Sequence, residues 1–359
     1  MDRPFFTVVM PAYGVEKYLK KAVDSIRSQT FGDWELIIVE DGSPDRTGEL
    51  ADRLAGKDSR IRVVHHEKNK GLSEARNTGI CQARGKYIWF MDPDDSVEES
   101  LLQEVQGALE ENPARLTVFG HVEEYYEKDG SFSYAHPVKP RRRLCRNQGE
   151  VRKEILPLEQ ETLYGYAWNK IYDLDYIREK KLSYETVRLI EDIVFNIQYC
   201  MDIDTMNLLD ITPYHYAKRM EGSLTTKFVP DYYPLHRRRI AMLYEQQKYW
   251  GLDNRESCSV LGSLYGRYIL SALERNCDKR AEMNHGDRKK FCREIFADPL
   301  FKRLIPAAEA RDSRALKLAL TCMKAKSVFL CLAFGRAVHL VRGSLPDRKS
   351  TPLNSSHQR

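Results

Sequence analysis

The chain has 359 residues, of which 42% are hydrophobic and 30% charged, and its formal net charge is +5. This length can bury one large core or two smaller ones, and so mild a charge, without any motif of a nucleic-acid-binding module, gives no support for DNA or RNA as a partner. No run reaches the roughly 20 apolar residues that span a bilayer, and the chain enters a strand soon after Met1, so we expect neither a membrane span nor a signal peptide. Eight scattered cysteines without metal-ligand spacing indicate a reducing compartment, and we expect a cytoplasmic protein.

Short apolar runs and helical patterns alternate along the first part of the chain. Strands are predicted at residues 5–10, 34–39, 61–65 and 87–91, because these runs are rich in β-branched and aromatic residues. Helices are predicted at residues 15–29, from Ser43 to about residue 55, and at 73–83, with Ser43 as an N-cap and Pro44 in the first turn. This alternation is typical of βαβ units. The sequence therefore predicts an α/β fold, with a mostly parallel sheet and helices on both of its faces.

Three carboxylates follow the fourth predicted strand, at the point where Pro93 ends the apolar run. Ligands of open α/β sheets bind beyond the carboxyl ends of strands, so Asp92, Asp94 and Asp95 are candidate ligand contacts. Like charges so close together repel unless a cation or donors compensate them, and carboxylate oxygens suit Mg²⁺ or Mn²⁺, which also bridge phosphates. One hypothesis is a divalent metal that holds a nucleotide diphosphate. The other is an acidic helix start capped by Ser96.

Two more charged residues lie in the loops of this half. Asp41 ends the second strand beside Gly42, where its carboxylate can accept from a base N–H or a ribose hydroxyl, or form an Asx turn that only shapes the loop. Arg76 falls in the first turn of its predicted helix, where the helix dipole disfavours a cation. A phosphate or carboxylate ligand would explain this cation, and so would an ion pair with Glu74 or Asp92. The glycine-rich fingerprints of dinucleotide-binding and P-loop enzymes do not occur, which removes the main support for both classes.

The chain then continues with a helix at residues 98–110, a strand at 116–119 and a hairpin formed by 122–126 and 132–135 on an Asp-Gly turn. The basic run at 139–143 can meet an acidic lipid head group or a phosphorylated acceptor, or it can be a solvated loop.

A second acidic pair, Glu191 and Asp192, opens a segment with helical spacing. Taken alone, such a pair is explained by the helix dipole.

From about residue 232 the pattern becomes long, helical and rich in Arg and Lys. Helices are predicted at residues 231–247 and 257–274, with more beyond them. The run at 328–341 is apolar but too short to span a membrane, so it is either an amphipathic helix in the headgroup plane or a buried helix packed on the main domain. Residues 346–359 are polar, and we expect them to be disordered.

At this point several motifs together resemble those of family-2 glycosyltransferases. They occur in the order of that family at residues 11–19, 25–30, 40–43, 75–79 and 90–95, and later at 166–172 and 214–223. The resemblance implies a Rossmann-like, A-type nucleotide-sugar transferase fold that acts with inversion. Two positions depart from the family pattern: Gly14 replaces the usual Asn, and Glu40 replaces the usual first Asp of the pair before Gly42.

The resemblance also assigns roles to individual residues. It implies a nucleotide-sugar site formed by Pro11, Ala12, Tyr13, Glu16, Asp41, Arg76, Asp92, Asp95, Arg219 and Ser223. It implies Mn²⁺ or Mg²⁺ at Asp92 and Asp94, which form an Asp-x-Asp motif. Asp192 would be the general base with Glu191 in support. Trp168 and Lys170 would contact the acceptor or the donor, and the alternative for Trp168 is a place in the core. For these roles to work together, folding must bring the acid pair at 191–192 close to the aspartates that follow residue 90.

The function that these residues imply is an inverting, metal-dependent transfer of a sugar from a nucleotide diphosphate, with UDP expected, to a hydroxyl of a saccharide or lipid-linked saccharide. We expect this hexosyltransferase to act in surface polysaccharide biosynthesis, at the cytoplasmic face of the membrane. The alternatives are a sugar nucleotidyltransferase and a non-catalytic nucleotide-sugar-binding protein. We expect a nucleotide-sugar half at residues 1–122, an acceptor half at 123–228, a helical region at 229–345 and a tail at 346–359. For the helical region, peripheral membrane contact and packing on the main domain are the two alternatives.

Overall fold

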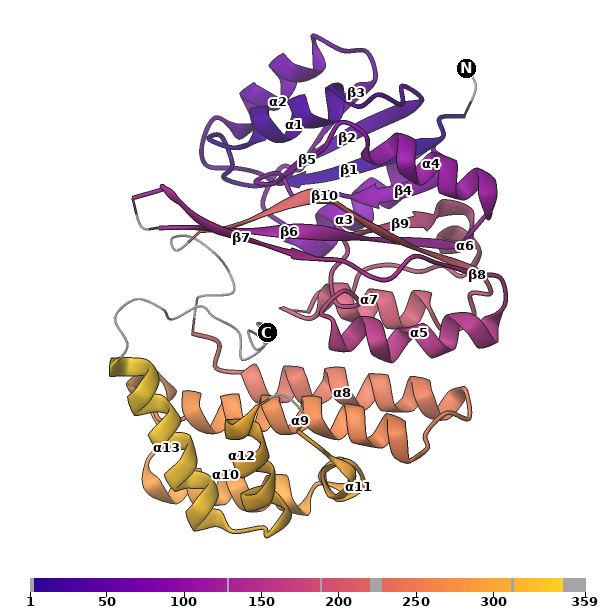
Figure 1. Ribbon diagram of the computed structural model, residues 1–359. Helices are drawn as coiled ribbons and strands as arrows, with labels where there is room; N and C mark the ends of the chain where they lie inside the picture. Colours follow the sequence, from indigo (N-terminus) through magenta and orange to yellow (C-terminus); the bar gives the residue numbers. More distant parts are fainter. Residues whose placement is uncertain (1–2, 128, 188, 220–227, 311–312, 345–359) are drawn as a thin grey trace. The chain divides into compact units, whose positions relative to one another are not determined.

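Figure 1 shows the computed structural model of the protein, which describes residues 3–127, 129–187, 189–219, 228–310 and 313–344. The chain divides into two compact units, Met1–Ser223 and Leu224–Arg359. The finer division of the first unit at residue 122 stays a prediction, and the expected disordered tail lies outside the described residues. None of the helices in the described ranges combines the length and the apolar composition that a membrane crossing needs.

The first unit contains a ten-stranded sheet and its covering helices. The strands are β1 (Phe6–Ala12), β2 (Trp34–Glu40), β3 (Ile61–His65), β4 (Tyr87–Phe90), β5 (Ser96–Val97), β6 (Leu116–Tyr126), β7 (Phe132–Val138), β8 (Arg143–Cys145), β9 (Lys170–Asp173) and β10 (Met206–Lys218). The helices are α1 (Leu19–Arg27), α2 (Thr47–Ala55), α3 (Leu72–Gln82), α4 (Leu101–Glu111), α5 (Gln148–Gln160), α6 (Leu174–Glu179) and α7 (Glu191–Tyr199).

The strand order is β3-β2-β1-β4-β9-β6-β10-β5, with β7 paired to β6 and β8 paired to β10. Strands β1, β2, β3 and β4 are mutually parallel, and β6 and β10 run the same way, because antiparallel β9 lies between β4 and β6. The carboxyl ends of all these parallel strands therefore meet at one edge of the sheet, and the start of β9 reaches the same edge. The predicted mostly parallel α/β sheet is confirmed.

Alternation along β1 shows how the two faces are covered. Val8 and Met10 join one buried cluster with apolar residues of α1, α2 and α4. Val9 points to the other face, where α3 approaches so closely that a Cβ on Gly79 would lie 2.2 Å from a Val9 methyl carbon. On that same side, Phe90 of β4 packs edge-on against Phe195 of α7, with ring centroids 6.2 Å apart. Helices thus cover both faces, as the sequence predicts.

Three local predictions are wrong. Ser43 does not cap a helix, since α2 begins at Thr47; instead the Ser43 N–H donates to Glu40 Oε1 at 2.6 Å, inside a tight loop. Ser96 does not open a helix either, because it lies in β5 and pairs with His215 of β10, while α4 begins five residues later. The predicted strand at 116–119 and the first hairpin strand at 122–126 are one continuous strand, β6, whose hairpin partner is β7.

The second unit is helical, as predicted (Figure 1). Its helices are α8 (Tyr232–Tyr249), α9 (Arg255–Arg275), α10 (His285–Ala297), α11 (Pro299–Leu304), α12 (Arg314–Lys324) and α13 (Val328–Ser344), with short 3₁₀ turns η2 (Lys279–Ala281) and η3 (Ile305–Ala307). Glycines let helices pack closely on α9: a Cβ on Gly262 would lie 2.3 Å from Leu304 O, and one on Gly335 of α13 would lie 2.9 Å from Leu273 Cβ. One face of α13 is therefore buried within its own unit.

Candidate active site

The candidate site lies at the edge of the sheet where the parallel strands end. The loop after β4 carries Asp92 and Asp94, Arg219 follows β10, and the first turn of α7 carries Glu191 and Asp192. These residues are far apart in the sequence, and the sheet order is what brings their elements to one place.

A buried guanidinium joins these elements. The Arg76 side chain is 2% exposed, and its Nη1 donates a short hydrogen bond to Asp192 Oδ1. Its Nη2 lies 3.5 Å from Asp92 Oδ1, and Nη1 lies 4.0 Å from Glu191 Oε1. The Tyr184 ring lies beneath, with its centroid 5.1 Å from the guanidinium carbon. The prediction that the acid pair and the aspartates after β4 come together is confirmed.

The position of Arg76 follows from how α3 packs. Arg76 is the fifth residue of α3 and not in its first turn, so the expected conflict with the helix dipole does not arise. Gly79 lies three residues on, on the same side of the helix, and its missing side chain lets α3 approach β1. This close approach holds the Arg76 stem in the core while its charged end reaches the carboxylates.

Helix α7 presents its two acids at its N-terminus, where the helix dipole favours negative charge. Asp192 Oδ2 accepts from the Ala167 N–H at 3.0 Å, so Arg76 and a backbone donor fix both of its carboxylate oxygens. The Asp192 side chain keeps 17% of its surface exposed. Glu191 Oε2 is buried, and in the described ranges it has no hydrogen-bond donor.

The charges at this site do not balance. Among the described residues, Asp92, Glu191 and Asp192 form ion pairs with one cation, Arg76. Burial raises the pKa of Asp92 to about 7, and repulsion from Asp94 and Asp192 adds to the shift. Burial likewise raises the pKa of Glu191 to about 7, with Asp192 as the main repelling charge. Burial alone would lower the pKa of Arg76, but these carboxylates raise it above its usual range. The site thus has excess negative charge that a bound cation would relieve.

Asp94 and Arg219 form the more open side of the site. The Asp94 side chain is 45% exposed, and Arg219 Nη1 lies 3.4 Å from its Oδ2. Arg219 Nη2 also donates to the Asp94 carbonyl oxygen at 3.1 Å, and its guanidinium lies 4.2 Å from the centroid of the Tyr18 ring. Arg219 therefore ties the end of β10 to the loop after β4. Ser223, the other residue predicted in this segment, lies outside the described residues.

Residues 7–171 match the family described as "Glycosyl transferase family 2". These residues form a family-2 glycosyltransferase domain. The uncharacterized glycosyltransferase EpsJ of Bacillus subtilis (strain 168) is 33% identical over 223 residues, which are 62% of this chain and 63% of EpsJ. The chain thus spans less than two thirds of that relative's length.

Two solved structures share the fold of the chain. TarS of S. aureus, residues 1–349 in complex with UDP-GlcNAc, covers 94% of this chain and 92% of its own with a TM-score of 0.65 at 16% identity. TarS is a poly(ribitol-phosphate) beta-N-acetylglucosaminyltransferase. The mannosyltransferase PcManGT from Pyrobaculum calidifontis, in complex with GDP-Man and Mn²⁺, covers 94% of this chain and 88% of its own with a TM-score of 0.50 at 14% identity. These likenesses show that the chain has the A-type glycosyltransferase fold.

Asp41 of the family-2 domain does not point at a ligand. It is 3% exposed, and its carboxylate accepts from the backbone N–H groups of Lys70 and Gly71, both at 2.8 Å, and contacts His66 Nδ1 at 2.6 Å. These bonds use both carboxylate oxygens to hold the loop between β3 and α3. The structure therefore favours the alternative that Asp41 shapes its loop, and its burial argues against the predicted nucleoside contact.

Asp95 is also structural. It is 3% exposed, and it accepts from the Tyr214 hydroxyl at 2.7 Å and from the Ala217 N–H at 2.9 Å. Burial raises the pKa of Asp95 well above its usual range, and the neighbouring aspartates add to the shift. Tyr214 OH also accepts from the Asp92 N–H at 3.3 Å, so this pair clamps the acidic loop onto β10. Its burial and these bonds favour a role in loop structure, and the contact of Asp95 with the nucleotide sugar stays a prediction.

The remaining residues of the predicted nucleoside pocket fall into two groups. Pro11 and Ala12 are buried in β1, where only their backbone can reach a ligand. Tyr13 is 50% exposed just beyond the strand, and Glu16 is partly exposed in an ion pair with Arg46 at 2.7 Å. Tyr13 and Glu16 are thus the members whose side chains reach the surface.

Trp168 and Lys170 lie beneath the site and not on its surface. Lys170 is fully buried, and its Nζ donates to Leu163 O, Tyr166 O and Asn169 Oδ1 at 2.6, 2.6 and 2.8 Å. Trp168 is 2% exposed and stacked against the Tyr166 ring, with centroids 4.7 Å apart. Burial lowers the pKa of Lys170 to about 7, although three acceptors require the three donors of the ammonium form. This burial favours core roles for both residues, and their acceptor contacts stay a prediction.

The donor set fits a divalent metal that arrives with its ligand. The described residues contain no group of three or more His, Cys, Asp or Glu side chains that could hold a metal ion by themselves. Mg²⁺ and Mn²⁺ are commonly bound by one or two carboxylates together with substrate phosphates. Asp94 is open to solvent and Asp92 is 28% exposed, and the excess negative charge at the site favours a cation.

Tyr18 and Tyr184 are site residues that the sequence analysis missed. They support the guanidinium groups of Arg219 and Arg76 through their rings. Tyr18 lies within the helix predicted at residues 15–29, and Tyr184 lies in a loop without any periodic signal. Only the folded arrangement of the chain reveals these two roles.

Proposed function

We propose that this chain is an inverting glycosyltransferase that moves a sugar from a UDP-sugar to a hydroxyl of a saccharide or lipid-linked saccharide. The observation that carries the proposal is the meeting of Asp92 and Asp192 at the buried Arg76 guanidinium. In the proposal, the Asp92 carboxylate faces the donor side through a bound cation, and the neighbouring Asp192 carboxylate faces the acceptor. The TarS complex with UDP-GlcNAc, which has the same fold, supports a UDP-linked donor.

In the proposed reaction, Asp192 is the general base. It takes the acceptor proton as the oxygen attacks the anomeric carbon from the side opposite the leaving diphosphate, so a single displacement inverts that carbon. Base catalysis needs a carboxylate that stays fixed and unprotonated within about 3 Å of the hydroxyl. Arg76 and the Ala167 N–H hold the two carboxylate oxygens of Asp192 in place. Glu191 acts as a positioning residue, because its negative charge helps to hold Arg76 in place.

Asp92 and Asp94 are the residues that would hold Mn²⁺ or Mg²⁺. When bound, the ion supplies positive charge to the departing diphosphate. Arg219 lies beside Asp94 and is partly exposed, so it can contact the same diphosphate. The Mn²⁺ complex of PcManGT supports metal use in this fold.

We further propose that the enzyme works at the cytoplasmic face of a membrane, on a surface polysaccharide or polymer acceptor. All eight cysteines are free thiols, as expected in a reducing compartment. Helix α13 has an exposed apolar face in which Phe329, Leu330, Leu340 and Val341 are 46–77% exposed. Residues 313–344 contain no Asp or Glu but six cations, Arg314, Lys317, Lys324, Lys326, Arg336 and Arg342. An apolar stripe with cations and no acids suits an anionic lipid surface.

The experiment that tests the proposed donor is a panel of nucleotide sugars with and without Mn²⁺, read as a shift of the melting temperature. A ligand at 100 times its Kd stabilises the native state by about 2.7 kcal/mol, so the preferred donor should stand out. The Asp94→Ala variant should lose the Mn²⁺-dependent shift, whereas Asp210→Ala, at an exposed position of β10, should keep it. No stabilisation by any nucleotide sugar, or an unchanged shift in Asp94→Ala, would count against the proposal.

A further inference from the structure

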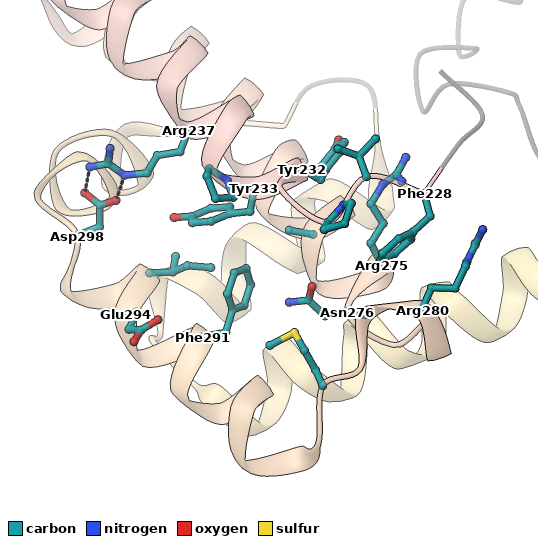
Figure 2. A pocket seen from close by; sticks show the side chains of 17 residues that line it. Phe228, Tyr232, Tyr233, Arg237, Arg275, Asn276, Arg280, Phe291, Glu294 and Asp298 are labelled. Atoms are coloured by element: carbon teal, nitrogen blue, oxygen red, sulfur yellow. Dashed lines mark hydrogen bonds and ion pairs between the residues drawn. The ribbon is translucent and has the colours of Figure 1, made fainter. Parts of the chain in front are cut away.

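The helical unit contains a cavity of about 480 Å³ that the proposed sugar transfer does not use. Its walls come from the segment before α8, the start of α8, the end of α9, the η2 turn and α10, all within the second unit (Figure 2). This volume is typical of sites for small organic molecules and is larger than a single inorganic anion requires.

One wall of the cavity is aromatic and held in place. The Tyr233 ring packs edge-on against Phe291, with centroids 5.0 Å apart, and the Tyr233 hydroxyl is 2.8 Å from that of Tyr265. Figure 2 shows Tyr233 and Phe291 facing the interior of the cavity, with Asn276 close by. These fixed rings offer a flat apolar surface to the carbon body of a ligand.

Two of the three guanidinium groups that line the cavity are neutralised. Arg237 forms a two-pronged ion pair with Asp298, in which Nη2 lies 2.9 Å from Oδ1. Arg280 pairs with Asp278 at 2.7 Å. Neither group needs a ligand to balance its charge.

The third guanidinium, that of Arg275, has no carboxylate partner among the described residues. Its plane lies over the Tyr232 ring, with 4.4 Å from the guanidinium carbon to the ring centroid. Stacking of this kind fixes the plane of the guanidinium and leaves its edge N–H groups free to donate. The adjacent Asn276 Nδ2 is buried and, within the described ranges, has no acceptor. Two neighbouring donors at the cavity thus lack acceptors, which indicates a ligand that carries an oxyanion.

The cavity also offers an acceptor. The Glu294 side chain lines it, and among the described residues its ion-pair partner is Lys290, at 3.8 Å. A carboxylate would repel a simple anion but accepts hydrogen bonds from hydroxyl groups. The combination of unpaired donors, a carboxylate acceptor and fixed aromatic rings therefore matches a polyhydroxy compound with one negative group.

We propose that this cavity binds an acidic saccharide unit, with its phosphate or carboxylate on Arg275 and Asn276, its hydroxyls toward Glu294 and its carbon face on Tyr233 and Phe291. That this unit is part of the acceptor rests on the proposed function. The binding itself does not, because every residue of the cavity lies outside the family-2 domain.

Direct binding to the full chain tests the proposal, with excess UDP and Mn²⁺ present to occupy the donor site. The probes are glucose 1-phosphate, glucuronate, glucose and inorganic phosphate, measured by calorimetry and ligand-observed NMR. At least one acidic sugar should bind more tightly than both glucose and inorganic phosphate. Arg275→Gln should weaken that binding about tenfold or more, the usual effect of losing one charged hydrogen bond. Arg293→Gln, which removes an exposed charge of α10 outside the cavity, should change it less than twofold.

A second variant tests the role of the cavity space independently of the Arg275 charge. Ala281→Phe keeps every charged group but fills part of the cavity, so it should also abolish binding, with circular dichroism and the melting temperature confirming that both variants fold. The proposal is overturned if no acidic sugar binds, if inorganic phosphate binds as tightly as glucose 1-phosphate, or if folded Arg275→Gln binds like the wild type. A failure of the proposed sugar transfer would appear elsewhere, as a loss of UDP-sugar binding with Arg275-dependent binding intact.

Discussion

Three carboxylates share one buried guanidinium in this protein, and that imbalance is the residue-scale feature on which the proposed chemistry depends. Arg76 can fully compensate one acid, and its shortest contact is with Asp192. Asp92 and Glu191 are left with raised pKa values in the free protein. A free site that carries excess charge is destabilised, and a ligand that brings a cation recovers that energy on binding.

The raised pKa of Glu191, to about 7, makes the stability of the native state depend on pH. Between about pH 4.5 and 7 the native state keeps a proton that the unfolded chain releases, so stability falls as pH rises through this window. Glu191→Gln cannot ionise and should lack this fall, gaining about 2 kcal/mol relative to the wild type between pH 5 and pH 8. Urea unfolding at the two pH values measures the difference, with Glu99→Gln as the exposed control. A wild-type-minus-variant difference that does not change with pH would contradict the assignment.

Lys170 provides a second test at this scale. A core role predicts that its mutation lowers stability, whereas an acceptor contact predicts that its mutation raises the KM for the acceptor. Lys170→Met would leave three buried acceptors without their donor, which should destabilise the protein by about 3 kcal/mol. The melting temperature should fall by roughly 5–10 °C, while Lys153→Met on the exposed face of α5 should have little effect. If Lys170→Met instead kept the wild-type melting temperature and raised only the KM for the acceptor, the surface role would be restored.

The sequence predicted which acids matter better than it predicted what each one does. Asp92 and Asp192 were recognised as a pair, and the structure brings them to the same guanidinium. In the sequence, Asp41 and Asp95 are equally good candidates for ligand contacts, yet both carboxylates accept hydrogen bonds from other residues of the protein. The donors come from residues 29–30 positions away for Asp41, and 119–122 positions away for Asp95, so no local spacing could reveal them.

At the scale of elements, periodicity predicted the strands and helices of the parallel half and the long helices of the second unit well. It failed where a short polar segment was fixed by tertiary contacts. Ser43 looks like a helix cap, but its Oγ accepts from the Gly14 N–H of the loop after β1 at 3.2 Å, and α2 begins only at Thr47. Ser96 looks like another cap, but antiparallel pairing with β10 draws it into a strand. In both cases a contact with another element outweighs the local preference.

Helix α13 has an exposed apolar face, and the membrane contact proposed for this face can be tested directly. Phe329 and Leu340 are eleven residues apart and so lie on the same row of the helix. The double variant Phe329→Ser, Leu340→Ser should bind phosphatidylglycerol-containing vesicles at least tenfold more weakly than the wild type, since each buried apolar side chain contributes about 1.5 kcal/mol or more. Tyr249→Ser, which changes an exposed aromatic residue of α8, should bind normally. Vesicle binding that is unaffected by the double variant, or by high salt, would argue against this surface.

At the scale of the whole molecule, the alternation of strands and helices predicted the fold class, and the motif order predicted the family-2 domain. Neither could predict the antiparallel strand β9, which pairs with both β4 and β6 and precedes α6 and α7 in the chain. Neither could predict the cavity of the helical unit, because its walls come from several helices. The sequence pattern of each helix predicts that it packs against others, but not where a space remains between them.

The central claim is that one site binds the donor through Asp92 and Asp94 and activates the acceptor through Asp192. The most direct test measures donor binding and sugar transfer side by side in Asp192→Asn, once the nucleotide-sugar panel has given the donor. The account predicts donor affinity within about threefold of the wild type and transfer reduced by roughly 10²–10⁴, with Asp210→Asn active in both assays. Near-normal transfer by Asp192→Asn would contradict the account.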